Sequence, residues 1–134
     1  MAGFMVLIAT WYMHQFFRKC LVSIPLNLFG LGLMGIGFFS GNHVPYHGMS
    51  AMLAFLSGGI SAIATATINS VPFRYFGIAF GSTALTTWFI AILSPNLLSP
   101  FIGDGGTERW VAYPIMLWLI GFGGYLMNEP TATP

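Results

Sequence analysis

The chain has 134 residues, and only seven of them are Asp, Glu, Lys or Arg. Charged residues make up 5% of the sequence, against about 25% in a soluble domain, while hydrophobic residues make up 56%. Such a composition excludes a surface that faces water on all sides, so the bilayer is the expected solvent for most of the molecule. The net charge is +1 and there is no basic patch, which argues against a nucleic-acid partner.

Five apolar segments predict the fold. A membrane-spanning helix needs about 20 apolar residues, with a range of roughly 17–25. The expected helices cover residues 2–17, 21–39, 49–69, 75–94 and 109–127, and a polar tail follows at 128–134. The segments are continuously apolar and do not alternate, which argues against a β-barrel. We therefore expect one all-α domain, a polytopic transmembrane bundle of five helices.

Basic residues predict how the bundle is oriented. Arg18 and Lys19 lie in the first connection and Arg74 in the third, so alternating passes bring them to one side. The opposite side carries only Arg109. Because basic residues mark the cytoplasmic face, we expect a multi-pass protein of the plasma membrane with Arg18, Lys19, Arg74 and the C-terminus inside. The segments His43–His47 and Asp104–Arg109 then lie outside.

Small residues predict how the helices pack. Helices in a bilayer associate through close contact between their backbones, and residues four apart share a helical face. We expect these residues to pack within the chain, and homo-oligomers or other membrane subunits are alternative partners beside membrane lipids. The small residues are Ser50, Ala54, Gly58, Ala62 and Ala66 in the third helix and Gly77 and Gly81 in the fourth.

Polar residues inside the apolar segments are few. An amide in hydrocarbon needs a hydrogen-bond partner. Asn27 is expected to bond to another helix, whereas Asn69 is expected to reach the inner interface. No carboxylate or basic residue falls at mid-membrane depth, which disfavours a pump or a channel.

A candidate site gathers at the expected outer face. His43 and His47 are four apart, and Pro45 between them suggests that the third helix has not yet begun. Two imidazoles opposite Asp104 and Glu108 have the chemistry of a transition-metal site, of an acid–base pair or, with Arg109, of a phosphate site. The chain has no HExxH, paired CxxC or GxSxG motif, so interfacial polar residues that meet water are the simpler interpretation, and we predict no metal and no cofactor. The expected binding cluster is His43, His47, Asp104, Glu108, Arg109 and Tyr113.

The connection before the last helix is the longest. Its first half is apolar and is expected to lie on the membrane surface. Thr107 is the expected N-cap, and Glu108 at the first helical position suits the positive end of the helix dipole. Pro114 leaves the carbonyl of Trp110 without its helical donor. We expect Glu108 and Arg109 to form a polar cluster with His47 that closes the outer end of the bundle.

Two stretches resemble a known family. Residues 105–127, with the pattern GG-x-ER-x-x-x-YP, and residues 47–64 are similar to the membrane proteins grouped as domain-of-unknown-function family 998, especially its archaeal members. The resemblance implies a six-helix fold of which this chain has the last five helices, as expected of a truncated or mis-started gene product. Ser40 and Gly41 stand where family members often have Pro and Glu, so the carboxylate of a His–Glu site is missing. The family has no established activity, so the resemblance implies fold and location only.

Three functions remain in view. The leading hypothesis is a non-enzymatic integral membrane protein, either lipid-interacting or an accessory subunit. The alternative is a membrane-embedded enzyme that acts on a lipid headgroup at the outer face, with His47, Glu108 and Arg109 as catalytic candidates. A small oligomeric transporter is the third. An enzyme requires His43 or His47 within hydrogen-bond reach of Asp104 or Glu108 around a pocket.

Single-cysteine variants, made with Cys20→Ser, test the expected orientation. In intact cells, a membrane-impermeant thiol reagent should label Gly41→Cys and Gly105→Cys and should leave Ser70→Cys unlabelled, because Ser70 lies beside the basic connections. Labelling of Ser70→Cys together with protection of Gly105→Cys would overturn the orientation.

Overall fold

The computed structural model describes residues 1–39 and 44–128, and every regular element in these ranges is a helix. This confirms the predicted all-α bundle. His43 and most of the expected C-terminal tail lie outside the described residues. The helices are α1 (Ala2–Phe17), α2 (Cys20–Phe38), α3 (Val44–Ala64), the short 3-10 helix η1 (Thr65–Thr67), α4 (Phe73–Leu93) and α5 (Pro95–Asn128).

Within residues 1–39 and 44–128, four helices have the length and apolarity of a membrane span. They are α2, Pro45–Thr67 in α3 and η1, α4, and Gly105–Asn128 in α5. These helices indicate a membrane protein. The remaining helix, α1, has 16 residues and is therefore about 24 Å long at 1.5 Å per residue. That is shorter than the hydrocarbon core of about 30 Å, so the fifth pass that we expect depends on the shortest helix.

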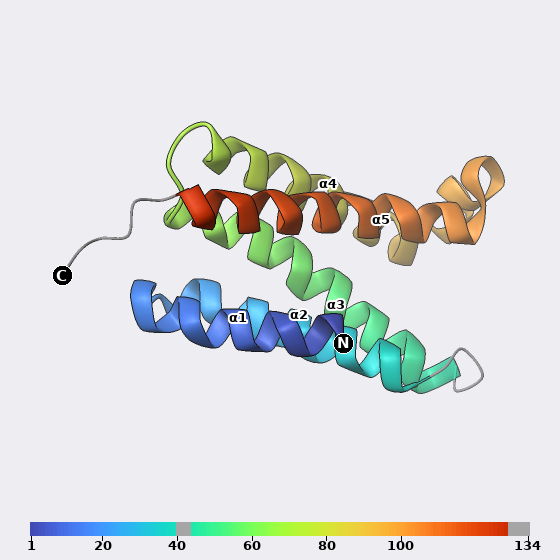
Figure 1. Cartoon of the computed structure of the whole chain (residues 1–134). Coiled ribbons are helices and arrows are strands. Elements are labelled where there is room, and N and C mark those ends of the chain that lie inside the picture. The colour runs from blue at the N-terminus through green and yellow to red at the C-terminus, as the bar shows by residue number, and fades with distance from the viewer. Residues whose placement is uncertain (40–43, 129–134) are drawn as a thin grey trace.

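The central helix is α3. It runs diagonally between the α1–α2 pair and the α4–α5 pair, and it contacts α2, α4 and α5 (Figure 1). The α1–α2 connection, the α3–α4 connection and the last turn of α5 lie together at one end of the bundle. We call this the basic end, because Arg18, Lys19 and Arg74 lie in or beside these connections. The end of α2 and the first turns of α5 lie at the opposite end.

The small residues of α3 pack within the chain on two sides. On the α2 side, a Cβ atom added at Gly32 would lie 2.6 Å from the backbone nitrogen of Ala54. On the α4 side, a Cβ atom at Gly77 would lie 2.7 Å from the carbonyl oxygen of Ala62. Such distances leave no room for a side chain. The backbones of α2 and α4 therefore both approach α3 as closely as glycine allows.

The third helix begins earlier than expected. It starts at Val44, so Pro45 lies in the first helical turn and does not mark a preceding loop. Proline is well tolerated there, because the first N–H groups of a helix have no intrahelical partner and its fixed φ suits the helix. We expected Pro45 to lie before the helix, and this expectation was wrong because proline suits the first turn.

The connection after α4 is also helical. Residues from Pro95 onward form the first part of α5, and the helix breaks at Gly103, whose φ of 69° and ψ of 169° are open to glycine. Thr107 does not act as an N-cap. Its hydroxyl donates to the carbonyl oxygen of Gly103 at 3.0 Å, which is a back-bond within the helix. Glu108 consequently lies beyond the first turn after the break.

Leucine substitutions at two glycines test the packing of α3. A Cβ atom at Gly58 would lie 2.9 Å from Ile115 and 3.0 Å from the ring of Phe29, whereas nothing lies within 4 Å at Gly37. Gly58→Leu should lower the free energy of unfolding in detergent by about 1–3 kcal/mol through overpacking. Gly37→Leu, the matched control, should leave it unchanged or raise it slightly. Equal melting temperatures for the two variants would show that close contact at Gly58 does not stabilise the fold.

Candidate functional site

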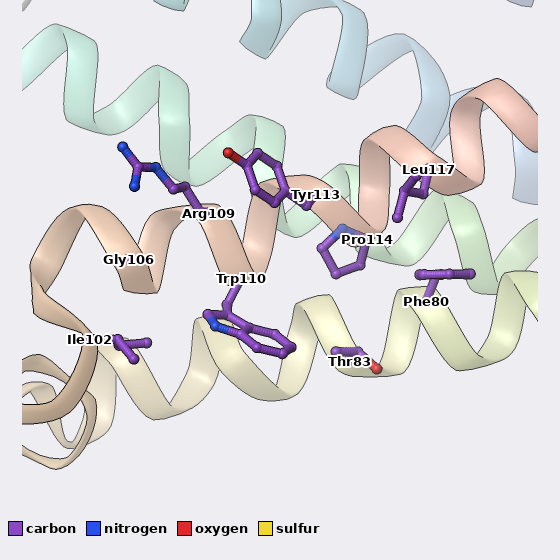
Figure 2. Close-up of a pocket in the computed structure, with 9 residues that line it drawn as sticks. All are labelled: Phe80, Thr83, Ile102, Gly106, Arg109, Trp110, Tyr113, Pro114 and Leu117. Atoms are coloured by element: carbon purple, nitrogen blue, oxygen red, sulfur yellow. The ribbon is translucent and has the colours of Figure 1, made fainter.

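A groove with a volume of about 720 Å³ lies between α4 and α5 (Figure 2). It extends along α5 from the helix break at Gly103 toward the middle of the bundle. We call it the α4–α5 groove. Its lining residues are Phe80, Thr83, Ile102, Gly106, Arg109, Trp110, Tyr113, Pro114 and Leu117.

Helical spacing brings the lining residues together. Gly106, Trp110 and Pro114 follow one another at intervals of four, as do Arg109, Tyr113 and Leu117, so the lining residues form two neighbouring rows along α5. A Cβ atom at Gly106 would lie 3.0 Å from the Cβ atom of Ile102, so glycine lets the side chain of Ile102 pack against α5 at this point. On α4, Phe80 and Thr83 are three apart and form the facing wall.

The walls of the groove are apolar in character. The only hydroxyl on the α4 wall belongs to Thr83, and it donates to the carbonyl oxygen of Ala79 at 2.9 Å. Phe80, Ile102, Pro114 and Leu117 add apolar side chains to the lining. The carbonyl of Trp110 lacks its helical donor because Pro114 has no N–H, so one polar group of the α5 backbone lies within the lined region.

Among the described residues of the lining, Arg109 is the one that carries a charge. Its side chain is exposed, and Figure 2 shows the guanidinium extending from the same side of α5 as the hydroxyl of Tyr113, while Trp110 points toward α4. A guanidinium is always charged and presents several donors in one plane, which matches phosphate and carboxylate oxygens. The groove therefore combines an apolar interior with a single cationic rim.

The structure distributes the predicted cluster over different surroundings. Arg109 and Tyr113 line the groove, whereas His47 and Glu108 do not. Nδ1 of His47 lies 2.7 Å from the carbonyl oxygen of Phe39 and donates to it, because a carbonyl can only accept. Glu108 is exposed. His43 and the side chain of Asp104 lie outside the described part of the chain, although the backbone of Asp104 belongs to α5.

A second groove lies at the same end of the bundle. Its volume is about 620 Å³. Two of its lining residues on α3, Tyr46 and Ser50, carry hydroxyl groups, and the hydroxyl of Ser50 donates to the carbonyl oxygen of Tyr46 at 2.8 Å. The rings of Phe39 and Tyr46 stack at its edge, with centroids 5.3 Å apart. None of its lining residues is charged. They are Phe39, Tyr46, Met49, Ser50, Met52, Leu53, Leu56 and Trp88.

Neither a metal site nor a paired thiol is found in the residues that the structure describes. No three His, Cys, Asp or Glu side chains among them lie close enough together to hold a metal ion. Cys20 is an exposed free thiol at the basic end of the bundle.

Hydrogen bonds between helices gather at the basic end and its vicinity. Lys19 donates to the carbonyl oxygen of Thr67 at 2.8 Å, which ties the α1–α2 connection to η1. The N–H of Ser70 donates to the hydroxyl of Tyr125 at 2.8 Å, which ties the α3–α4 connection to α5. Deeper in the bundle, Nε1 of Trp118 donates to the hydroxyl of Thr65 at 3.2 Å. Sequence spacing gives no signal for these bonds, because the partners are about 50 residues apart.

Of the two asparagines, Asn27 differs from expectation. The amide of Asn27 donates to the carbonyl oxygen of Ser23 at 2.9 Å, within its own helix, so it forms no bond there to a neighbouring helix. Nδ1 of His14 lies 2.8 Å from the hydroxyl of Ser23 and links α1 to α2 instead. The side chain of Asn69 is covered by protein, with 2% exposure, and the residue lies just beyond the candidate span Pro45–Thr67, at the basic end.

No protein-family model, curated protein or solved structure matches this chain. The groove itself combines a long apolar hollow, aromatic walls and the guanidinium of Arg109 at its rim.

Valine substitutions test the bond between Trp118 and Thr65. Trp118 is fully buried, so Thr65→Val leaves an indole N–H without an acceptor and should lower the free energy of unfolding by about 1–3 kcal/mol. Thr83→Val is the matched control, because its hydroxyl is exposed and bonds only to its own helix; we expect a change within about 0.5 kcal/mol. Similar unfolding midpoints for both variants in detergent would contradict a stabilising role for this bond.

Proposed function

We propose that this chain is a non-enzymatic integral membrane protein that binds an anionic phospholipid in the α4–α5 groove. One acyl chain lies along the apolar walls, and the phosphate of the headgroup contacts Arg109. The observation that carries the proposal is the composition of the lining, which is apolar along its length and has a single cation at the rim.

Shape explains how the groove holds an acyl chain inside a membrane. The bilayer offers a lipid tail an apolar environment everywhere, so hydrophobicity alone gives no preference for the groove. Preference arises from dense contact with a preformed surface. Phe80 on α4 and Trp110 and Leu117 on α5 provide rigid walls for such contact.

Charge explains which headgroup is favoured. Arg109 lies in the first turns after the break at Gly103, next to the end of the bundle that we expect at the outer interface. Its guanidinium can donate two parallel hydrogen bonds to phosphate oxygens. Tyr113, one turn further on the same side of α5, adds a hydroxyl at the depth where tyrosines prefer to lie.

The enzymatic alternative has less support. It requires a histidine and a carboxylate around one pocket, and the groove is lined by neither His47 nor Glu108. The proposed resemblance to family 998 agrees with a role for the groove, since its most specific pattern supplies Gly106, Arg109, Tyr113 and Pro114 to the lining. We retain that resemblance as part of the proposal.

Fluorescence quenching by brominated lipids measures this binding. In the variant Trp11→Phe/Trp88→Phe, the remaining tryptophans are Trp110 in the groove and Trp118, which is fully buried. Brominated phosphatidylglycerol in nanodiscs should quench Trp110 at lower mole fraction than brominated phosphatidylcholine. We expect a preference of about fivefold, equivalent to about 1 kcal/mol for a partly exposed charge pair.

Two arginine variants separate specific binding from general attraction to the membrane. Arg109→Gln should abolish the preference for phosphatidylglycerol and leave quenching by phosphatidylcholine unchanged. Arg74→Gln removes the same charge at the basic end and should keep the preference. The proposal fails if both brominated lipids quench Trp110 equally in the protein with Arg109. It also fails if Arg109→Gln retains the preference for phosphatidylglycerol.

A further inference from the structure

The strongest unexplained feature of the fold is the side chain of Asn69. It lies between η1 and α4, with 2% exposure. Neither its Oδ1 nor its Nδ2 has a hydrogen-bond partner among the described residues. An amide has two N–H donors and an oxygen with two lone pairs, and buried polar groups in native proteins are almost always paired. At 2% exposure the side chain has almost no contact with bulk solvent that could replace the missing partner.

The polar groups near Asn69 in the chain are engaged with one another. Its own N–H donates to the carbonyl oxygen of Thr65 at 3.0 Å. The carbonyl oxygen of Thr67 accepts a hydrogen bond from the ammonium group of Lys19. The N–H and hydroxyl of Ser70 both meet the hydroxyl of Tyr125, at 2.8 and 3.1 Å. The segment from Thr67 to Ser70 is thus the place where the α1–α2 connection and α5 are both attached to the end of α3.

The unsatisfied atoms identify the chemical class of ligand. A cation would satisfy only Oδ1, and an anion would satisfy only Nδ2. Water both donates and accepts, and a buried water typically makes two to four hydrogen bonds to groups that are otherwise unpaired. A larger ligand would need an opening to the surface, whereas Asn69 is almost fully covered and lines neither of the two grooves.

We propose that Asn69 binds a buried water molecule at the junction of η1, the α1–α2 connection and α5. The water accepts from Nδ2 or donates to Oδ1, and its remaining bonds go to oxygen atoms with spare lone pairs in the same segment, such as the carbonyl of Thr67. It forms part of the contact between the two helix pairs, because the groups around it are held by Lys19 on one side and Tyr125 on the other.

Nuclear magnetic resonance of the ¹⁵N-labelled full chain in micelles detects such a water directly. The side-chain amide protons of Asn69 should show a cross-peak to water, with the sign of a through-space effect and not of proton exchange. Asn27 is the matched control: its amide donates to the carbonyl of Ser23 within a spanning helix, and it should show no such cross-peak. An assigned Asn69 amide without a water cross-peak would refute the proposal.

A substitution gives a second, independent result. Asn69→Leu keeps the approximate size of the side chain and removes its polar atoms. If the amide were truly unpaired, its removal would raise the melting temperature in detergent. Our proposal requires a fall of a few degrees, because the water loses one of its partners, while Asn27→Leu should change the melting temperature less. A clear rise for Asn69→Leu would show that no water is bound there.

Discussion

The bundle depends on the close approach of α3 to the helices on both of its sides. In hydrocarbon, apolar side chains gain nothing by leaving lipid tails for one another, so helices are held where their backbones pack densely. Ala54 of α3 lies against Gly32 of α2, and Ala62 lies against Gly77 of α4. Because one helix supplies both contacts, α3 fixes the α1–α2 pair relative to the α4–α5 pair. The hydrogen bonds at the basic end stabilise this arrangement further.

The same constraint determines where a ligand can lie. The glycines of α4 are used against α3, and its bulkier residues Phe80 and Thr83 are left to form one wall of the α4–α5 groove. On α5, Gly106 and Pro114 lie four residues to either side of the large indole of Trp110, so the surface of α5 that faces the groove is uneven. A bundle with uniformly branched side chains along α5 would have no hollow at this position. The site is therefore a consequence of how the helices pack.

Composition and apolar spacing were sufficient to predict the all-α fold. So few charges indicate a membrane protein, and continuous apolar segments without alternation indicate helices. Local rules misjudged the helix starts: Pro45 was interpreted as a breaker although it suits a first turn, and Thr107 was interpreted as a cap although its hydroxyl bonds back to Gly103. The polar cluster of His47, Glu108 and Arg109 stays a prediction. The groove itself was beyond the sequence, because a hollow depends on which faces of α4 and α5 meet, and no periodicity within one helix carries that information.

The short first helix has a consequence for the membrane itself. As a fifth pass, its 16 residues would match a hydrocarbon layer roughly 6 Å thinner than the average of about 30 Å, while the central helix α3 and the helix α4 beyond it are 21 residues each. A lipid layer in contact with the protein would have to be compressed beside α1 and relaxed beside α4. Such a gradient in thickness favours tilting of the molecule or its residence in thinner membranes, at a small elastic cost for each ångström of mismatch. The asymmetry of helix length would in this way give the bundle a preferred lipid environment, without any specific recognition of a lipid.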